Sequence, residues 1–226
     1  MTQFPFDSTI ENRPIRDIAY ETLKHAIITG EIPAGSRIVE TLYADKLHIS
    51  RTPLREALRN LERDGLVEYV LHRGVIVRAF TTDDIEEIFT IRNSMMMLIL
   101  PSVVERVTDE DIRGMENILK DMDVALQNND FSATGVYNRQ FHSMLEHVSN
   151  KLRILRVIDS QEEYITRFSA VAIANTERRE KSHDEHYQMV QLLKDRDLDG
   201  LEQLMLHHLE ESKATCLAAL RANKKA

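Results

Sequence analysis

Cysteine, glycine and long apolar runs are scarce in this sequence, and each scarcity excludes a class of protein. Cys216 is the single cysteine, so no intrachain disulfide can form and a disulfide-stapled secreted domain is excluded. With only seven glycines in 226 residues, the chain has little material for the glycine-rich loops that bind nucleotide phosphates. The most apolar run, residues 94–104, is too short to span a bilayer and is flanked by charge, which predicts a core-facing helix.

Signals for export and for common catalytic machinery are also missing. The opening residues, MTQFPFDSTIENR, lack the basic and apolar segments of a signal peptide, which together with the single cysteine predicts a cytoplasmic protein. The sequence contains no HExxH or GxSxG motif. A metal-dependent enzyme built on a helical bundle is the alternative function, but only Glu180–His183 has the Glu-x-x-His spacing of a ferritin-like site.

Charge is unevenly distributed along the chain. Of 29 basic and 37 acidic residues, the first 80 positions hold eleven of each, so the net charge of −8 belongs entirely to residues 81–226. Apolar residues make up 42% of the chain, which is enough for at least one buried core. The length and the charge asymmetry together predict two modules with different roles.

Three helices and a hairpin are predicted in the first module. Apolar residues recur at helical spacing in residues 14–29, 38–47 and 51–64. The period then changes, because apolar side chains alternate with others through residues 66–80. This alternation indicates a hairpin that turns near Gly74, a residue free to adopt positive φ. Three helices followed by a two-stranded ribbon predict a winged helix-turn-helix.

Helical periodicity continues without a strand pattern through the rest of the chain. The segments TTDD (81–84) and TDED (108–111) each begin a helix with a hydroxyl cap followed by acids. Pro101 is expected to end or kink the first of these helices. Further helices are predicted at about 131–149, 151–172, 177–195 and 197–222.

The predicted fold class is therefore mainly α, with a winged helix-turn-helix followed by an all-helical antiparallel bundle of about six helices. The predicted division is an N-terminal arm at residues 1–13, the winged helix-turn-helix at 14–80 and the bundle at 81–226.

Arginines form a stripe along the third predicted helix. The stripe consists of Arg51, Arg55, Arg59 and Arg63. On a helical wheel it spans about 120°, while the apolar residues of the helix lie at about 240–340° from its first member. The apolar face is thus expected to dock on the module, and the stripe to face outward. The alternative is an ordinary charged outer face paired with Glu56 and Glu62.

The context of the arginine stripe favours contact with DNA. Ser50 is the predicted N-cap, and the helix follows a tight turn from a shorter helix, as the recognition helix of a helix-turn-helix does. Arg51 and Arg55 would then reach base edges, where the arginine fork pairs with guanine O6 and N7. Ser50 and Thr52 are placed to bind phosphate. Arg73, at the hairpin tip, is placed for the adjacent minor groove or backbone.

Residues 19–81 resemble the N-terminal domain of GntR-family bacterial transcription regulators. The resemblance is carried by IITGEIPAGSRI, SRTPLREALRNLERDGLVE and RGVIV, which are collinear with the family pattern. It implies DNA contacts at Arg51, Thr52, Arg55, Arg73 and Gly74. The family often has a further basic contact in the second helix, where this chain has Thr41.

Residues 82–226 resemble the helical effector domain of the FadR-like subfamily, the FCD type. The segment NRQFHSMLEHVSNKL (138–152) matches one signature of that domain. The segment EHYQMVQLLKDRDLDGLEQLMLHHL (185–209) matches its closing signature. The resemblance implies that this module responds to a bound small molecule or metal.

Three histidines are candidates for a metal site. His142, His186 and His208 fall on different predicted helices and could converge in a bundle interior to bind zinc, nickel, manganese or iron. From spacing alone, a surface or hydrogen-bonded core histidine is the alternative for each. The resemblance adds that FCD domains often bind a divalent metal with an Asp and three His at these positions. Asn138 replaces that Asp, which predicts weaker metal binding or a site that holds only effector.

A small organic acid is the expected effector in the same cavity. Arg92 matches a family arginine that can clamp a carboxylate. The Glu that usually follows four positions later is Met96 here, which implies a more apolar pocket. A helix-surface ion pair with Glu87 or Asp84 is the alternative for Arg92.

These features together predict a homodimeric, ligand-responsive regulator, with repression relieved by an organic acid as the family-typical direction. Two recognition helices would lie in successive major grooves of a pseudo-palindromic operator, about one helical turn (~34 Å) apart. Effector or metal in the acidic bundle would act by favouring one dimer geometry over another.

Overall fold

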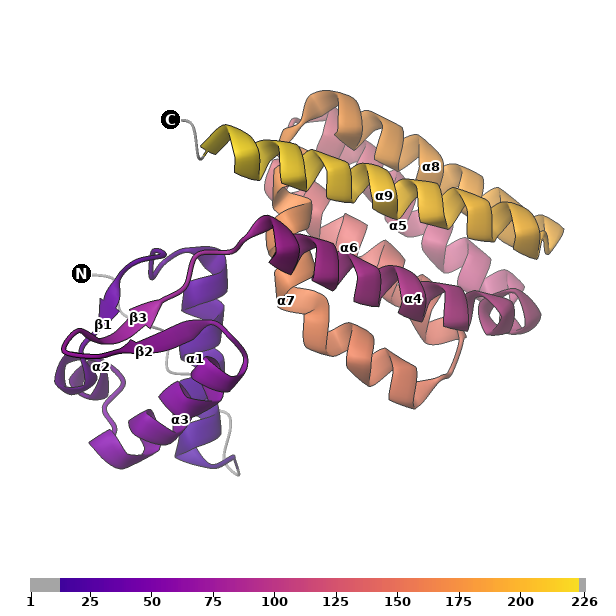
Figure 1. The fold of residues 1–226 in the computed structure, drawn as a ribbon. Coiled ribbons are helices and arrows are strands. Elements are labelled where there is room, and N and C mark those ends of the chain that lie inside the picture. The colour runs from indigo at the N-terminus through magenta and orange to yellow at the C-terminus, as the bar shows by residue number, and fades with distance from the viewer. Residues whose placement is uncertain (1–12, 224–226) are drawn as a thin grey trace. The chain divides into compact units, whose positions relative to one another are not determined.

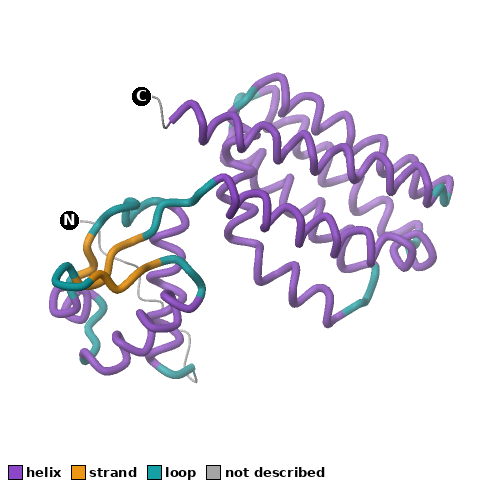
Figure 2. The backbone as a smooth tube through the Cα atoms, in the orientation of Figure 1, coloured by secondary structure: helices purple, strands orange, loops and turns teal. Residues whose placement is uncertain are grey.

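The computed structural model describes residues 13–223, apart from the side chains at 163, 167, 169–174 and 223. By its internal contacts the chain divides into two units, Met1–Phe80 and Thr81–Ala226. Figure 1 labels their helices and strands, and Figure 2 separates helices from strands by colour. The predicted arm at residues 1–13 lies outside the described residues, except for Arg13.

Unit 1 is built on the three predicted helices, α1 (Ile15–Thr29), α2 (Glu40–Lys46) and α3 (Arg51–Arg63). Gly30 ends α1 at φ 85°, a left-handed conformation that glycine adopts without strain. Both α1 and α2 pack against α3. The fully buried side chains at this junction are apolar: Leu23, Leu54, Leu58 and Leu61. Burial of this face fixes which side of α3 remains available to solvent.

A small antiparallel sheet completes unit 1, with strand order β1-β3-β2. The predicted hairpin is present as β2 (Val67–Val70) and β3 (Gly74–Val77), with Gly74 at φ 79°. The third strand, β1 (Arg37–Ile38), was not predicted. Two residues are too few to display strand alternation, and their pairing with β3 depends on a partner far along the chain.

Unit 2 contains six helices within residues 82–223, as the predicted bundle requires. Their bounds are α4 (Thr82–Arg106), α5 (Asp109–Gln127), α6 (Phe131–Val148), α7 (Leu152–Ala174), α8 (Thr176–Asp195) and α9 (Leu198–Asn223). Capping boxes on Thr81 and Thr108 begin α4 and α5, where the hydroxyl-plus-acid segments predicted helix starts. The mainly α fold class is therefore confirmed.

The core of unit 2 is made by side chains from all six helices. α4 packs on α9 and α7, α5 packs on α6 and α8, and α8 packs on α9. Figure 1 shows α8 and α9 running side by side. Completely buried members of this core include Met96, Leu100, Met115, Phe141, Met189, Leu201 and Met205. This packing brings the inner faces of α6, α8 and α9 together.

Pro101 does not end α4, so that part of the prediction was wrong. The helix continues to Arg106. Leu100, Val103 and Val104 on either side of the proline are buried in the core. Their burial offsets the hydrogen bond that the proline cannot donate.

Helix α4 also extends well beyond the apolar run at residues 94–104. Within residues 13–223, α4 has the length and composition that would allow it to cross a membrane, with mean hydropathy 1.3. In this structure it is a bundle helix, and 44% of its most apolar window is buried. The remaining apolar surface of α4 faces outward.

Candidate DNA-contact surface and candidate metal centre

The N-terminal half of α3 presents two arginines to solvent. The side chains of Arg51 and Arg55 are 56% and 52% exposed, whereas Leu54 and Leu58 on the opposite face are fully buried. The stripe therefore faces outward, as the helical wheel predicts. Ser50 is the N-cap residue, although its side chain makes no capping hydrogen bond.

Both arginines contact one acid, Glu40, at the start of α2. Arg55 Nε donates to Glu40 Oε2 at 2.7 Å, and Arg51 Nη2 donates to the same oxygen at 3.3 Å. Partial burial would raise the pKa of Glu40, but the hydrogen bonds from Arg55 and Arg51 outweigh this and lower it. The carboxyl group is thus ionised at neutral pH.

The two acids proposed as structural partners of the stripe have other contacts. Glu56 lies 3.5 Å from Arg16 on α1. Glu62 accepts a hydrogen bond from the backbone N–H of Tyr69 at 3.4 Å. Glu40 was not predicted as a partner of the stripe, because its contacts with α3 join residues eleven and fifteen positions apart on separate helices.

Further basic side chains lie at the hairpin tip. Arg73 is exposed and Gly74 is partly buried, and Thr52, on α3, is also exposed. The guanidinium of Arg37 on β1 lies close to Gly74, 3.6 Å from where a Cβ would stand. The tip therefore carries two arginines, of which the sequence analysis identified only Arg73.

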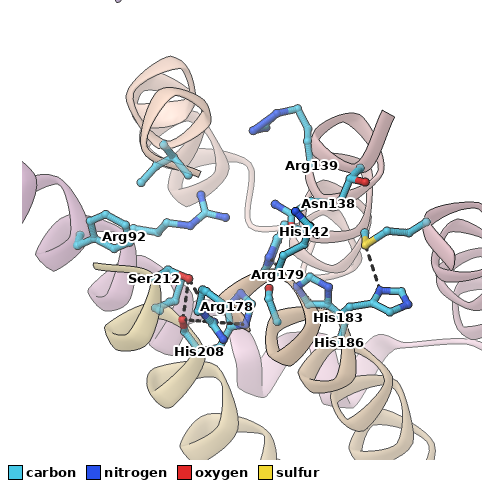
Figure 3. Close-up of a pocket in the computed structure, with 16 residues that line it drawn as sticks. Arg92, Asn138, Arg139, His142, Arg178, Arg179, His183, His186, His208 and Ser212 are labelled. Atoms are coloured by element: carbon cyan, nitrogen blue, oxygen red, sulfur yellow. Dashed lines mark hydrogen bonds between the residues drawn. The ribbon is translucent and has the colours of Figure 1, made fainter. Parts of the chain in front are cut away.

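Three histidines meet inside unit 2 (Figure 3). His142 on α6, His186 on α8 and His208 on α9 are all buried, with one possible ligand atom from each lying within 4.8 Å of the others. His142 Nε2 and His186 Nε2 are 3.2 Å apart. The structure thus brings together three of the residues proposed as metal ligands. Asn138, one turn before His142, lines the same cavity.

A buried ion pair holds the His208 ring in place. His208 Nδ1 lies 2.6 Å from Glu185 Oε2, so its Nδ1–H donates to this carboxylate and Nε2 remains available. Arg178 donates to both oxygens of Glu185, at 2.9 and 2.8 Å, and to the His208 carbonyl at 2.9 Å. The sequence analysis did not identify Arg178 or Glu185 as part of the site.

The environment keeps the three imidazoles neutral. Burial, followed by the proximity of the other rings, holds the pKa of His142 and of His186 well below 6.5. Burial also lowers the pKa of His208, although the hydrogen bond to Glu185 opposes it. Burial would raise the pKa of Glu185, but hydrogen bonds from His208 and Arg178 bring it down to about 2. Neutral imidazole is the form that binds a metal.

The donor set fits a borderline divalent metal. Two nitrogens bound to a tetrahedral metal at ~2.0–2.1 Å lie about 3.3 Å apart, close to the separation of the His142 and His186 Nε2 atoms. The Nδ1 atoms of these two rings are buried without a hydrogen-bond partner in the described part of the chain. Imidazole nitrogens with an amide oxygen from Asn138 suit zinc, nickel, manganese or iron.

Arg92 enters the same cavity from α4 and is paired inside the protein. Its side chain is 5% exposed, and Nη2 donates to Glu146 Oε1 at 2.9 Å. The alternative of a surface ion pair with Glu87 or Asp84 is therefore wrong. Burial raises the pKa of Glu146, with Arg92 acting against the rise. Arg92 Nη1 is buried and has no hydrogen-bond partner among the described residues, so it can donate a hydrogen bond to a ligand oxygen.

His183, one of the two residues whose Glu-x-x-His spacing suggested a ferritin-like enzyme, makes a different contact in this structure. His183 Nε2 lies 2.6 Å from Asp123 on α5, and Tyr187 donates to the other oxygen of Asp123 at 2.7 Å. Glu180 is exposed. Glu180 and His183 therefore do not form a paired metal-ligand motif.

Two family matches cover most of the chain. Residues 16–77 match the family described as bacterial regulatory proteins, gntR family, and residues 87–211 match the FCD domain. The uncharacterized HTH-type transcriptional regulator YdhC of Bacillus subtilis (strain 168) is 27% identical over 190 residues, covering 84% of this chain and 85% of YdhC. The Nta operon transcriptional regulator of Aminobacter aminovorans is 27% identical over 189 residues, covering 83% of this chain and 87% of that protein.

Solved structures show the same architecture. A putative transcriptional regulator GntR from Rhodococcus sp. RHA1 superposes with a TM-score of 0.66 at 25% identity, covering 90% of this chain and 98% of that one. E. coli McbR/YncC gives a TM-score of 0.71 at 20% identity, with coverage of 92% and 100%, and supports the fold alone. The names of these relatives are those of transcription regulators and not of enzymes. This protein belongs to the GntR family of bacterial transcription regulators, in the group that carries an FCD domain.

Proposed function

We propose that this regulator is a homodimeric repressor that binds a pseudo-palindromic operator and is controlled by a ligand in its FCD domain. One observation carries the proposal. The same chain presents exposed guanidinium groups at the leading end of α3 and, in a separate unit, encloses a histidine cluster beside an arginine nitrogen that has no partner among the described residues. The first feature suits DNA, and the second suits a small charged ligand.

The DNA-binding part of the proposal assigns roles to six residues. Arg51 and Arg55 contact base edges in the major groove, because both lie in the N-terminal half of the exposed face of α3. Ser50 and Thr52 bind phosphate at the start of the same helix. Arg73 and Gly74 at the hairpin tip contact the neighbouring groove or backbone.

The homodimer is supported by the outward face of α4. Ile91 and Leu98, seven residues apart on this helix, are 37% and 58% exposed, and Met95 between them is only partly buried. A second copy of the chain would bury this apolar stripe. Dimerisation would place two α3 helices in successive major grooves, ~34 Å apart. We place this assembly in the cytoplasm.

Control by a ligand is supported by the cavity. Asn138, His142, His186 and His208 would hold a divalent metal, which supplies a positive centre for an organic acid. Arg92 Nη1 would donate to the carboxylate of that acid. A repressing role is consistent with a relative named the gluconate operon transcriptional repressor of Bacillus licheniformis, 25% identical over 195 residues.

Selection of bound DNA from a random duplex pool tests the proposal. We expect the wild-type protein to enrich a pseudo-palindrome, and a divalent metal with a small organic acid to change the yield of bound DNA. Analytical ultracentrifugation of the same samples reports the dimer. If no sequence is enriched from the pool, the proposed operator binding is wrong. If no tested metal or acid changes the enrichment, the proposed ligand control is wrong.

A further inference from the structure

The contact between Glu40 and the α3 arginines has a geometry that bears on DNA specificity. We propose that Glu40 is a positioning residue that orients Arg55, and more loosely Arg51, so that the protein discriminates guanine-containing sites from other DNA. The inference rests on the proposed DNA-binding role of α3. It concerns a residue that would not itself need to touch DNA.

Glu40 is held by a rigid base. It is the first residue of α2, and α2 is anchored through buried Tyr43 and Ala44. The side chain of Glu40 is 23% exposed, less than half the exposure of either arginine. The carboxylate is therefore the fixed partner, and the two long arginine side chains are the mobile partners whose freedom it restricts.

The nitrogen atoms used in these contacts differ between the two arginines. Arg55 donates through Nε at 2.7 Å, and this hydrogen bond uses neither of the terminal nitrogens, Nη1 and Nη2. Those two nitrogens form the fork that pairs with guanine O6 and N7. Arg51 donates through Nη2 at 3.3 Å, so one terminal nitrogen is already engaged. Arg55 is thus the arginine prepared for bidentate reading of guanine.

The negative charge of Glu40 adds a second contribution. A carboxylate beside two guanidinium groups reduces the attraction of this surface for any phosphate backbone, whatever the sequence. Its effect on a correctly placed guanine is smaller, because the fork of Arg55 remains available. Glu40 therefore lowers general affinity for DNA while preserving the specific contact, which raises the ratio of specific to non-specific binding.

The test compares Glu40→Ala with Glu56→Ala. Glu56 is a matched control, because it also pairs with an arginine, Arg16 at 3.5 Å, but that arginine lies on α1. Each variant loses one negative charge from unit 1; Glu40→Ala removes the ion pairs with Arg51 and Arg55, and Glu56→Ala removes the one with Arg16. Affinity is measured by fluorescence anisotropy, at one fixed salt concentration, for three duplexes: the selected site, the site with its guanines replaced, and random sequence.

We expect Glu40→Ala to bind random DNA several-fold more tightly and to lose about tenfold in discrimination between the selected and the guanine-replaced sites. Glu56→Ala should retain the wild-type ratio. Equal ratios in Glu40→Ala and Glu56→Ala, with both variants folded by circular dichroism, would overturn the inference and leave the proposed function standing. A wild-type protein that selects no sequence would overturn both.

Discussion

Arginine–glutamate pairs occur in both units, but solvent surrounds one kind and protein surrounds the other. In unit 1 the Arg55 and Glu40 side chains are 52% and 23% exposed. In unit 2 the Arg92 and Glu146 side chains are 5% and 3% exposed. An exposed pair contributes little to stability and can exchange its partner for a phosphate or a base. A buried pair cannot lose one member without leaving an uncompensated charge in the interior. The same chemistry therefore gives an exchangeable surface in unit 1 and a fixed cavity wall in unit 2.

Removing one member of the buried pair should have the largest effect on stability. Glu146→Ala leaves Arg92 charged in the interior, and we expect it to lower the free energy of unfolding by roughly 3–5 kcal/mol. Chemical denaturation followed by circular dichroism measures the loss. Glu40→Ala is the exposed counterpart, and its cost should stay below about 1 kcal/mol.

A double variant sharpens this comparison. Replacing the pair together, as Arg92→Met with Glu146→Leu, removes both charges and should restore much of the stability lost in Glu146→Ala. Similar losses in Glu146→Ala and Glu40→Ala would show that burial does not separate the two kinds of pair.

Acidification should weaken unit 2 through its buried histidines. His142 and His186 have pKa values well below 6.5 in the folded chain, whereas in the unfolded chain they take up protons near pH 6.5. The stability that these neutral histidines contribute is therefore fully present above about pH 6.5 and is lost as the pH falls below it. At pH 5.5 the loss reaches up to ~1.4 kcal/mol for each of these histidines. Glu185, with a pKa of about 2, does not titrate in this range.

Denaturation of the chelator-treated protein at pH 7.5 and 5.5 measures this dependence. His186→Phe removes one of the groups and should reduce the difference between the two pH values. A wild-type protein equally stable at both would contradict neutral histidines in the interior.

The two units also differ in how much of them the sequence predicts. Helices were predictable in both, because apolar spacing and the Thr81 and Thr108 capping segments are local signals. Strand β1 was not, since two residues carry no periodicity. The convergence of His142, His186 and His208 could be anticipated from their places on three different helices of one bundle and from the family resemblance.

The partners of the arginines could not be anticipated in either unit. Arg92 and Glu146 are 54 residues apart, and Arg55 and Glu40 are 15 apart on separate helices. Which acid meets which arginine depends on the rotation and tilt of packed helices, and one-dimensional spacing does not specify either. The alternatives drawn from local spacing named nearby acids, Glu87 or Asp84 for Arg92 and Glu56 and Glu62 for the stripe, and these differ from the contacts found.

Removing an exposed arginine should affect DNA binding and leave stability nearly unchanged. We expect Arg55→Ala to lower affinity for the selected site by roughly 1–3 kcal/mol, the value of a bidentate contact with guanine. Arg51→Ala should cost less, because Glu40 already engages one of its terminal nitrogens. Titration of the selected duplex measures both variants. Arg63→Ala, at the far end of the same helix, is the control for lost charge, and equal losses in all three variants would argue against base contacts.

The smallest expected effect concerns Asn138, which stands where the resemblance to FCD domains predicts an Asp. Asn138→Asp replaces a neutral oxygen donor with a carboxylate beside His142, and we expect zinc affinity to rise about tenfold. The nearby cations Arg92 and Arg139 would help to hold the added charge. Competition with a chromophoric chelator measures the affinity, and Asn138→Ala should shift it in the opposite direction. Equal affinity in all three proteins would mean that position 138 does not contribute a ligand, and that the three histidines of unit 2 act without it.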